Sequence, residues 1–191
     1  MKKSGLYDPF YEHDGCGVGF IANINGQPSH QLVTDGITIL KNLVHRGATG
    51  GDLKTGDGAG ILIQLPHSFL LKEAEKQKFN LPQSGSYGAG MLFLPQNNTA
   101  RKKVITTIED IITGENGKIL GWRDVPTCPG CLGRTAMDSM PYICQVFVEF
   151  PSFSGMDLER KLYVIRRSIE NKVSEHGITM DEFYIPSFSC R

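Results

Sequence analysis

Apolar residues recur at intervals of three and four in four stretches of the chain. Such intervals place side chains on one face of an α-helix. The stretches are residues 30–44, 68–79, 100–113 and 157–176. Ser29 and Asp157 are candidates for the N-terminal caps of the first and last helices, and Gly47 and Gly177 stand where those helices are expected to end. The pattern therefore predicts four helices, two of them with both ends marked.

Short apolar runs between these helices have the length and composition typical of β-strands. They span residues 18–24, 61–65, 87–94, 118–124, 142–150 and 183–189. Asn25-Gly26 follows the first run and Asn116-Gly117 precedes the fourth, and this dipeptide is a strong turn signal. Strands joined by short turns and mixed with helices predict an α+β fold built in layers.

Composition excludes several classes of protein. The 191 residues are 40% hydrophobic and 21% charged, which suits one globular domain with a sizeable core. Twenty basic residues balance twenty acidic ones, so we expect neither nucleic acid nor a membrane surface as a partner. No run approaches the roughly 18 apolar residues of a membrane span, and the first residues lack the apolar core of a secretory signal. The expected location is the cytoplasm or the interior of an organelle.

The cysteines are odd in number, which argues against a secreted disulfide framework. There are five, and Cys144 and Cys190 lie in apolar runs that predict burial in the core. Cys128 and Cys131 have the C-x-x-C spacing of a redox pair or of half a zinc site, but no second pair follows at zinc-like spacing. The Pro-Gly between them favours a turn, so we expect no metal here, with a redox or zinc module as the open alternative.

Cys16 is the candidate for chemistry. It follows an acidic leader that ends at Gly15 and precedes an apolar run. If the peptide bond before it were cut, one residue would carry both a thiol, with a pKa near about 8.5, and an α-amine, with a pKa near about 7.7 to 8.0, which could take the thiol proton. The alternative is a small buried side chain at the start of a strand, where most unreactive cysteines are found.

His45-Arg46-Gly47 stands at the carboxyl end of the first predicted helix. A basic pair in the last turn of a helix complements the helix dipole, and that role needs no ligand. Alternatively, the planar guanidinium of Arg46 binds a substrate carboxylate through two hydrogen bonds. His45 has no partner that the sequence identifies, so we interpret it as structural.

The glycine-rich stretch Gly56–Gly60 has the appearance of a phosphate-binding loop. It lacks the lysine of a P-loop and a long apolar strand before it. A tight turn is the better interpretation, in which Asp57 accepts hydrogen bonds from nearby backbone amides.

Seven stretches of the chain together resemble one known family. They are Leu6–Phe20, Ser29-His30, Leu43–Ala48, Thr55–Gln64, Gly121–Pro126, Gln145–Val148 and Phe183–Ser189. In these stretches the chain is similar to the amino-terminal class II glutamine amidotransferase domain of glutamate synthase large subunits. The resemblance covers essentially all of the 191 residues.

The resemblance implies a fold and two site residues. The fold is the four-layered α/β/β/α sandwich of N-terminal-nucleophile hydrolases, which we expect to be incomplete at the C-terminus. Residues 1–15 would be a leader or propeptide, and residues 16–191 the first part of the amidotransferase domain. Cys16 would then be the nucleophile, and Arg46 would bind glutamine.

The resemblance also implies an activity and partners. The activity is hydrolysis of glutamine to glutamate and ammonia. The rest of the large subunit, with or without a small subunit, is expected to transfer this ammonia to 2-oxoglutarate. FMN and an iron-sulfur cluster are expected there, and no cofactor in this chain. The family's Asn-Gly oxyanion hole and the aspartate that binds the glutamine α-amine lie beyond residue 191. A non-catalytic domain that binds glutamine or a partner subunit is therefore the alternative.

Overall fold

The computed structural model describes residues 17–43, 52, 54–56 and 58–191. The chain divides into two compact units, which we describe separately. The first unit comprises Met1–Ile63 and Cys131–Met137, and the second comprises Gln64–Gly130 and Asp138–Arg191.

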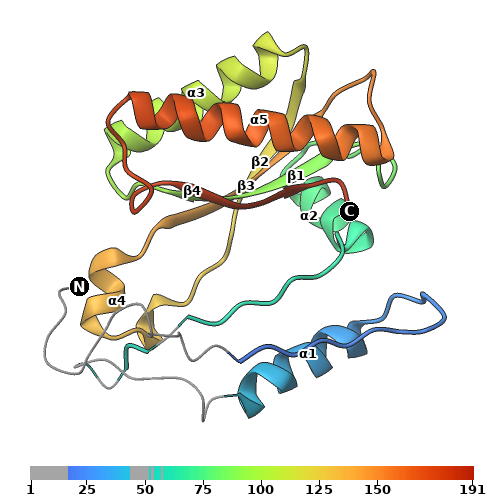
Figure 1. The fold of residues 1–191 in the computed structure, drawn as a ribbon, viewed down its shortest axis with the longest axis vertical. Coiled ribbons are helices and arrows are strands. Elements are labelled where there is room, and N and C mark those ends of the chain that lie inside the picture. The colour runs from blue at the N-terminus through green and yellow to red at the C-terminus, as the bar shows by residue number, and fades with distance from the viewer. Residues whose placement is uncertain (1–16, 44–51, 53, 57) are drawn as a thin grey trace, which may run out of the picture. The chain divides into compact units, whose positions relative to one another are not determined.

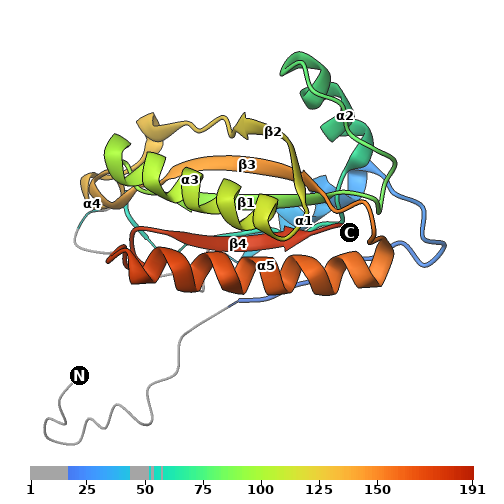
Figure 2. The same cartoon turned by 90° about the horizontal axis from the view of Figure 1, so that it is seen from above.

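A four-stranded antiparallel sheet forms the centre of the second unit (Figure 1). Its strands are β1 (Gly88–Leu94), β2 (Lys118–Asp124), β3 (Tyr142–Glu149) and β4 (Tyr184–Ser189). Their order across the sheet is β2-β3-β1-β4, which Figure 2 shows from above. The predicted strands over residues 87–94, 118–124, 142–150 and 183–189 are therefore confirmed, and so is the α+β class.

Two helices cover one face of this sheet. They are α3 (Asn98–Gly114) and α5 (Gly155–Glu175), which pack against each other and against the strands. Their apolar stripes meet alternate residues of the strands in one buried cluster. Ile108, Ile165 and Val146 are fully buried there, and Cys144 and Cys190 belong to the same cluster, as predicted. This face holds the main core.

A third helix, α2 (His67–Lys76), packs on the opposite face of the sheet. Leu70 of α2 joins Tyr87, Ala89 and Phe147 in a smaller buried cluster. Phe79 packs against the same cluster. A Cβ added to Gly121 would lie only 2.4 Å from Cδ1 of the Phe79 ring. Gly121 of β2 is thus the residue that lets the end of the α2 segment approach the sheet, next to a shift in the β2–β3 register.

Left-handed residues follow three of the described helices, and Gly177, with φ 77°, is the one that ends α5, as predicted. After α2, Lys78 has φ 62°, and the Phe79 amide donates to the Ala74 carbonyl. After α3, Asn116 has φ 60°, and the Gly117 amide donates to the Ile112 carbonyl. Both are Schellman endings. The turn predicted at Asn116-Gly117 is confirmed as the end of a helix.

The N-terminal cap predicted for the last helix is wrong. Ser154 is the cap residue of α5, and Asp157 lies within the first turn, where its carboxylate pairs with Arg160. An acidic residue is favourable in both positions because the free amides of the first turn carry partial positive charge. The pattern of apolar residues does not distinguish the two.

In the first unit, helix α1 (His30–Asn42) begins at the predicted cap. The Ser29 hydroxyl accepts a hydrogen bond from the Leu32 amide at 3.4 Å. The predicted end of this helix near Val44, and Gly47 after it, lie outside the described residues. The turn at Asn25-Gly26 is confirmed, since Gly26 has φ 68° and its amide donates to the Asn23 carbonyl.

Two predicted strands in the N-terminal part of the chain are wrong. In the structure, residues 18–24 have no strand, and neither do residues 61–65. A strand requires a neighbouring chain for its backbone hydrogen bonds, and an apolar run does not specify that neighbour. The described parts of the chain also contain two elements that the pattern did not predict as helices, a 3₁₀ turn at Pro129–Cys131 and α4 (Arg134–Ser139). The Pro-Gly turn between the two cysteines is thereby confirmed.

Candidate functional site

Cys16 and Arg46 both lie outside the described residues, as do the leader 1–15, His45 and Asp57. Their roles therefore stay predictions. Residues next to them in the sequence are described, and their contacts are given below.

The segment that follows Cys16 lies against α1. A Cβ added to Gly17 would lie 3.0 Å from Cδ2 of Leu43, and one added to Gly19 would lie 2.4 Å from Cγ2 of Ile39. Distances below about 3.0 Å do not occur for real Cβ atoms, so a side chain at residue 19 would force α1 and this segment apart. The alternating glycines after Cys16 are the sequence signal of this close contact.

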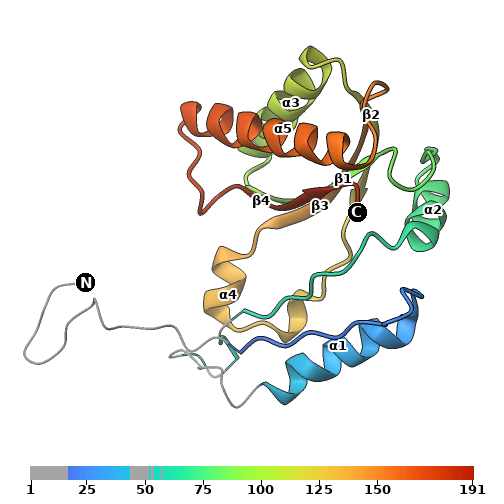
Figure 3. The same cartoon turned by 45° about the vertical axis from the view of Figure 1, so that its right-hand side comes forward.

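A second segment contacts the same helix. A Cβ added to Gly36, in the middle of α1, would lie 2.8 Å from Cδ1 of Ile61. Figure 3 shows α1 with the extended chain that precedes it running alongside. Three of the motif stretches therefore meet at α1: Gly17 and Gly19 belong to the first, Leu43 at the end of the helix to the second, and Ile61 to the third.

Asp52 is a polar centre of the first unit that the sequence analysis missed. Its carboxylate accepts hydrogen bonds from the Lys54 amide at 2.9 Å and from Thr55 Oγ1 at 3.0 Å. The backbone amides of Arg134 and Thr135, at the start of α4, donate to it as well. The hydrogen bond from the Lys54 amide is the largest influence on the pKa of this carboxyl, which lies below its usual value, although burial opposes the shift.

Gly133 lies directly beside this carboxylate. An added Cβ would be 2.0 Å from Oδ2 of Asp52 and 2.4 Å from Oγ1 of Thr55. The sequence predicts an aspartate-centred turn of this kind at Asp57, which lies outside the described residues. The same signal would have identified Asp52, because an aspartate in a glycine-rich segment often accepts a hydrogen bond from the backbone amide two residues later, here that of Lys54.

Cysteine placement separates two pairs. Cys128 and Cys131 are exposed, the first just before the 3₁₀ turn and the second as its last residue. Cys144 and Cys190 are buried, and burial raises the pKa of the Cys144 thiol to about 12 and that of Cys190 to about 11.

Across the part of the chain that the structure describes, His, Cys, Asp and Glu side chains do not gather in a group of three that could hold a metal ion. An iron-sulfur cluster, which needs about four cysteine thiolates, therefore does not fit the described residues.

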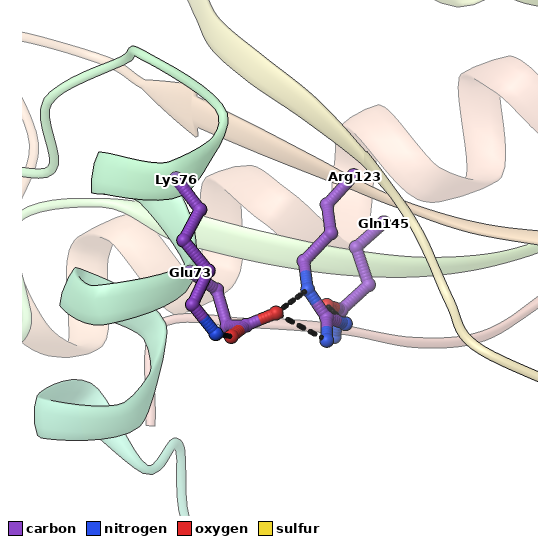
Figure 4. A network of polar contacts seen from close by, with 4 residues as sticks. All are labelled: Glu73, Lys76, Arg123 and Gln145. Atoms are coloured by element: carbon purple, nitrogen blue, oxygen red, sulfur yellow. Dashed lines mark hydrogen bonds and ion pairs between the residues drawn. The ribbon is translucent and has the colours of Figure 1, made fainter.

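A charged network joins α2 to the sheet in the second unit (Figure 4). Arg123 of β2 donates from Nε and Nη2 to Oε2 of Glu73, at 3.0 and 2.8 Å, and from Nη1 to Oε1 of Gln145 at 3.0 Å. The second oxygen of Glu73 accepts from Lys76. The side chain of Arg123 is 7% exposed. Hydrogen bonds from Lys76 and then from Arg123 lower the pKa of the Glu73 carboxyl.

This network has the features of a structural contact. Three nitrogens of the Arg123 guanidinium already have acceptors, and both Glu73 oxygens are bonded. The phenyl ring of Phe69 lies 5.5 Å from the guanidinium carbon, which adds a cation–π contact from α2. The arrangement therefore fixes α2 to the sheet and leaves little capacity for a ligand.

Among the described residues, no helix is both long enough and apolar enough to cross a bilayer.

Comparison with known proteins identifies one family. The family described as glutamine amidotransferases class II matches residues 16–191. The glutamate synthase [NADPH] large chain of Bacillus subtilis is 42% identical over 192 residues, which cover 100% of this chain. The ferredoxin-dependent glutamate synthase 2 of Synechocystis is 38% identical over 94% of this chain, and the glutamate synthase [NADH] of Saccharomyces cerevisiae is 39% identical over 86%. The resemblance inferred from the seven motif stretches is confirmed.

These relatives are much longer proteins. The chain spans 12% of the Bacillus subtilis protein, 11% of the Synechocystis protein and 8% of the yeast protein. Their names also differ in the electron donor, which is NADPH, ferredoxin or NADH. What they have in common with this chain is the region that the amidotransferase family covers.

Proposed function

Because the chain belongs to the family of class II glutamine amidotransferases, we propose that it forms the first part of a glutaminase domain of a glutamate synthase. The observation that carries this proposal is the extent of the family match, which begins at Cys16 and continues to the last residue. A match that begins at the candidate nucleophile also supports the proposed division into a leader, 1–15, and a domain, 16–191.

The proposed reaction uses Cys16 as nucleophile and base. Removal of residues 1–15 frees its α-amine, which takes the thiol proton. The thiolate attacks the side-chain amide carbon of glutamine, the carbon–nitrogen bond breaks, and the α-ammonium returns a proton to the leaving ammonia. Water then hydrolyses the thioester to glutamate and restores the thiol.

Arg46 is proposed to bind the α-carboxylate of glutamine. A guanidinium matches the two oxygens of a carboxylate and stays charged at every physiological pH. The described contacts support a common location with Cys16: Gly17, which follows Cys16, contacts Leu43, which precedes Arg46 by three residues.

The proposed fold is the four-layered α/β/β/α sandwich. The second unit supports it with one helical layer, α3 and α5, on one sheet. The opposite face of that sheet carries partly buried apolar residues, among them Met91, Phe93 and Ile143, which are suited to contact a further layer.

Transfer of the ammonia to 2-oxoglutarate is proposed to occur elsewhere in a longer protein, in the cytoplasm or in an organelle. FMN and the iron-sulfur cluster would be bound by that other part, since the described residues do not fit the cluster. No step of the reaction proposed for this chain involves them.

Labelling of Cys16 by a reactive glutamine analogue tests the proposal. The probe is a glutamine analogue with an electrophilic diazoketone in place of the amide, and mass spectrometry locates the label. We expect labelling at Cys16 that excess glutamine suppresses, and intact mass should show a chain that begins at Cys16. Cys128→Ala is the matched control, since that cysteine is exposed, and it should leave the labelling unchanged.

Two results would contradict the proposal. Equal labelling of Cys16 and Cys128 without protection by glutamine would show a reactive thiol but no glutamine site. Saturable glutamine binding by a chain that keeps residues 1–15 and does not react at Cys16 would favour the non-catalytic binding domain.

A further inference from the structure

We propose that Cys128 and Cys131 form a reversible disulfide with each other, by exchange with the disulfide of a low-molecular-weight thiol. This modification site takes no part in the reaction proposed for Cys16 and does not depend on it. Residues 128–131, which carry it, are all among those that the structure describes.

The turn between the two cysteines gives them a suitable separation. Pro129–Cys131 is a 3₁₀ turn, and Cys128 directly precedes it. Residues i and i+3 of a 3₁₀ turn lie above one another, and a rise of about 2.0 Å per residue puts their Cα atoms about 6 Å apart. Disulfides in proteins join Cα atoms that are about 4.4–6.8 Å apart. Because the turn is a local conformation of four consecutive residues, this separation depends on no contact elsewhere.

The two residues between the cysteines also favour closure of the ring. The φ angle of Pro129 is fixed near about −65°, which lies within the range of a 3₁₀ turn, so little backbone freedom remains to be lost. At Gly130 an added Cβ would meet nothing within 4 Å, so neighbouring segments do not crowd the turn. The turn therefore forms before any oxidation, and the disulfide does not have to build it.

Exposure separates this pair from the other two cysteines that the structure describes. Cys128 and Cys131 are both exposed, whereas Cys144 and Cys190 lie in the core at 3% and 2% exposure. In thiol–disulfide exchange a thiolate attacks the sulfur of another disulfide, so the attacking thiol must be accessible to that molecule. The exposed pair meets this requirement and the buried cysteines do not.

The alternative use of a C-x-x-C pair is half of a zinc site, which needs two further ligands. Within the described residues, His, Cys, Asp and Glu side chains form no group of three that could hold a metal ion. The described surroundings of the pair therefore favour exchange of disulfides over metal binding.

The exchange takes two steps, here written with oxidised glutathione. The thiolate of one cysteine attacks a glutathione sulfur, the sulfur–sulfur bond breaks, and one glutathione leaves as a thiolate that takes up a proton. The second cysteine, as a thiolate, attacks the protein sulfur of this mixed disulfide and releases the other glutathione. The two cysteines together lose two electrons and two protons, and oxidised glutathione gains both as it becomes two molecules of reduced glutathione.

Peptide mapping after oxidation tests the proposal. The folded chain is incubated with oxidised glutathione, the remaining thiols are blocked with iodoacetamide in denaturant, and trypsin then releases residues 124–134 as one peptide that contains Cys128, Cys131 and no other cysteine. We expect this peptide to be lighter by two hydrogens and to carry neither glutathione nor the alkyl group. Excess reduced glutathione should restore both thiols. Cys144 and Cys190, which fall in other peptides, should stay reduced.

Single variants should stop the exchange after its first step. In Cys131→Ser, glutathione should stay on Cys128, and the mixed disulfide should reach at least about ten times its level in the wild type, because the intramolecular second step is missing. Cys128→Ser should likewise keep glutathione on Cys131. Protection of Cys144 and Cys190 in each variant reports that the fold is kept.

The matched control moves the second thiol by one residue. Gly130→Cys combined with Cys131→Ser keeps two exposed thiols, at a position with room for a side chain, but removes the i, i+3 relation. Closure of the ring should then be at least about ten times slower than in the wild type.

Three results would overturn the inference. A wild-type peptide that carries two glutathiones would show that the thiols react separately. A cross-linked peptide that joins Cys128 to Cys16 would show that Cys131 is not its partner. Closure at the wild-type rate in the combined variant would show that the 3₁₀ turn does not select the pair.

Discussion

The two faces of the sheet in the second unit are built by different means. Under α3 and α5 the cluster is entirely apolar, and each of its buried members is at most 6% exposed. Under α2 the buried cluster has four residues, and the buried cation Arg123 lies beside it, bonded to a carboxylate 50 residues away in sequence. Both faces need a glycine, since a Cβ at Gly88 would lie 2.6 Å from Cδ2 of Leu162 in α5. The first face otherwise packs mainly by apolar burial, with hydrogen bonds to Glu159 of α5 from the Ser189 hydroxyl and the Cys190 amide, whereas the second face adds a buried arginine in an ion pair.

The largest expected effect is on the first face. Ile165→Ala removes a fully buried side chain of α5 and should destabilise the protein by about 2–5 kcal/mol, through lost burial and the cavity left behind. Urea unfolding measures the change. Val164→Ala on the exposed side of the same helix is the control and should cost less than about 1 kcal/mol. Equal costs would show that α5 is not packed on the sheet as described.

Gly121→Ala tests the close approach on the second face. The new Cβ would overlap with the Phe79 ring, so we expect a loss of about 1–3 kcal/mol from overpacking. In a Phe79→Ala background the ring is absent, and the same substitution should then cost less than half as much. Additive effects in unfolding experiments would contradict the contact.

Arg123→Met should destabilise the protein less than Ile165→Ala, because methionine keeps part of the apolar contact with Phe69 while the hydrogen bonds to Glu73 and Gln145 are lost. Lys76→Met is the control. Lys76 is 69% exposed, and an exposed ion pair contributes little. If both variants had the same urea midpoint, Arg123 would not be fixing α2 to the sheet.

The smallest expected effect is on the pH dependence of stability. The pKa of Glu73 is lowered in the folded protein by Lys76 and Arg123, so its contribution is complete above the unfolded pKa near about 4.5. It is lost as the pH falls through the lower folded pKa. Glu73→Gln should therefore make stability less dependent on pH below about 4.5. Parallel curves for the variant and the wild type, measured by urea unfolding between pH 3 and 7, would contradict this assignment.

Sequence reasoning was reliable for the elements of the first face. The apolar residues of α3 and α5 recur every three or four positions, and β1 and β3 are short, nearly continuous apolar runs. Such periods follow from local backbone geometry, so they are present in the sequence before any tertiary contact forms.

The second face and the first unit were predicted less well. Residues 18–24 and 61–65 have apolar runs typical of strands but are not strands in the structure. Arg123 and Gly133 were not identified at all, because their partners are distant in sequence, and the same is true of the contact between Asp52 and the start of α4. For Cys16 and Arg46, the residues themselves left a functional and a structural interpretation open, and the family resemblance favoured the functional one, which the labelling experiment addresses.

By itself, the sequence determined the four longer helices, four of the six predicted strands, the buried cysteines and the family. It could do so because periodicity, turn residues and motifs are local properties of the chain. Only the tertiary structure decided which apolar runs pair as strands, which glycines are approached by another segment, and which acid receives four donors. Those outcomes depend on contacts between distant residues, where one backbone fills the space and satisfies the hydrogen bonds of another.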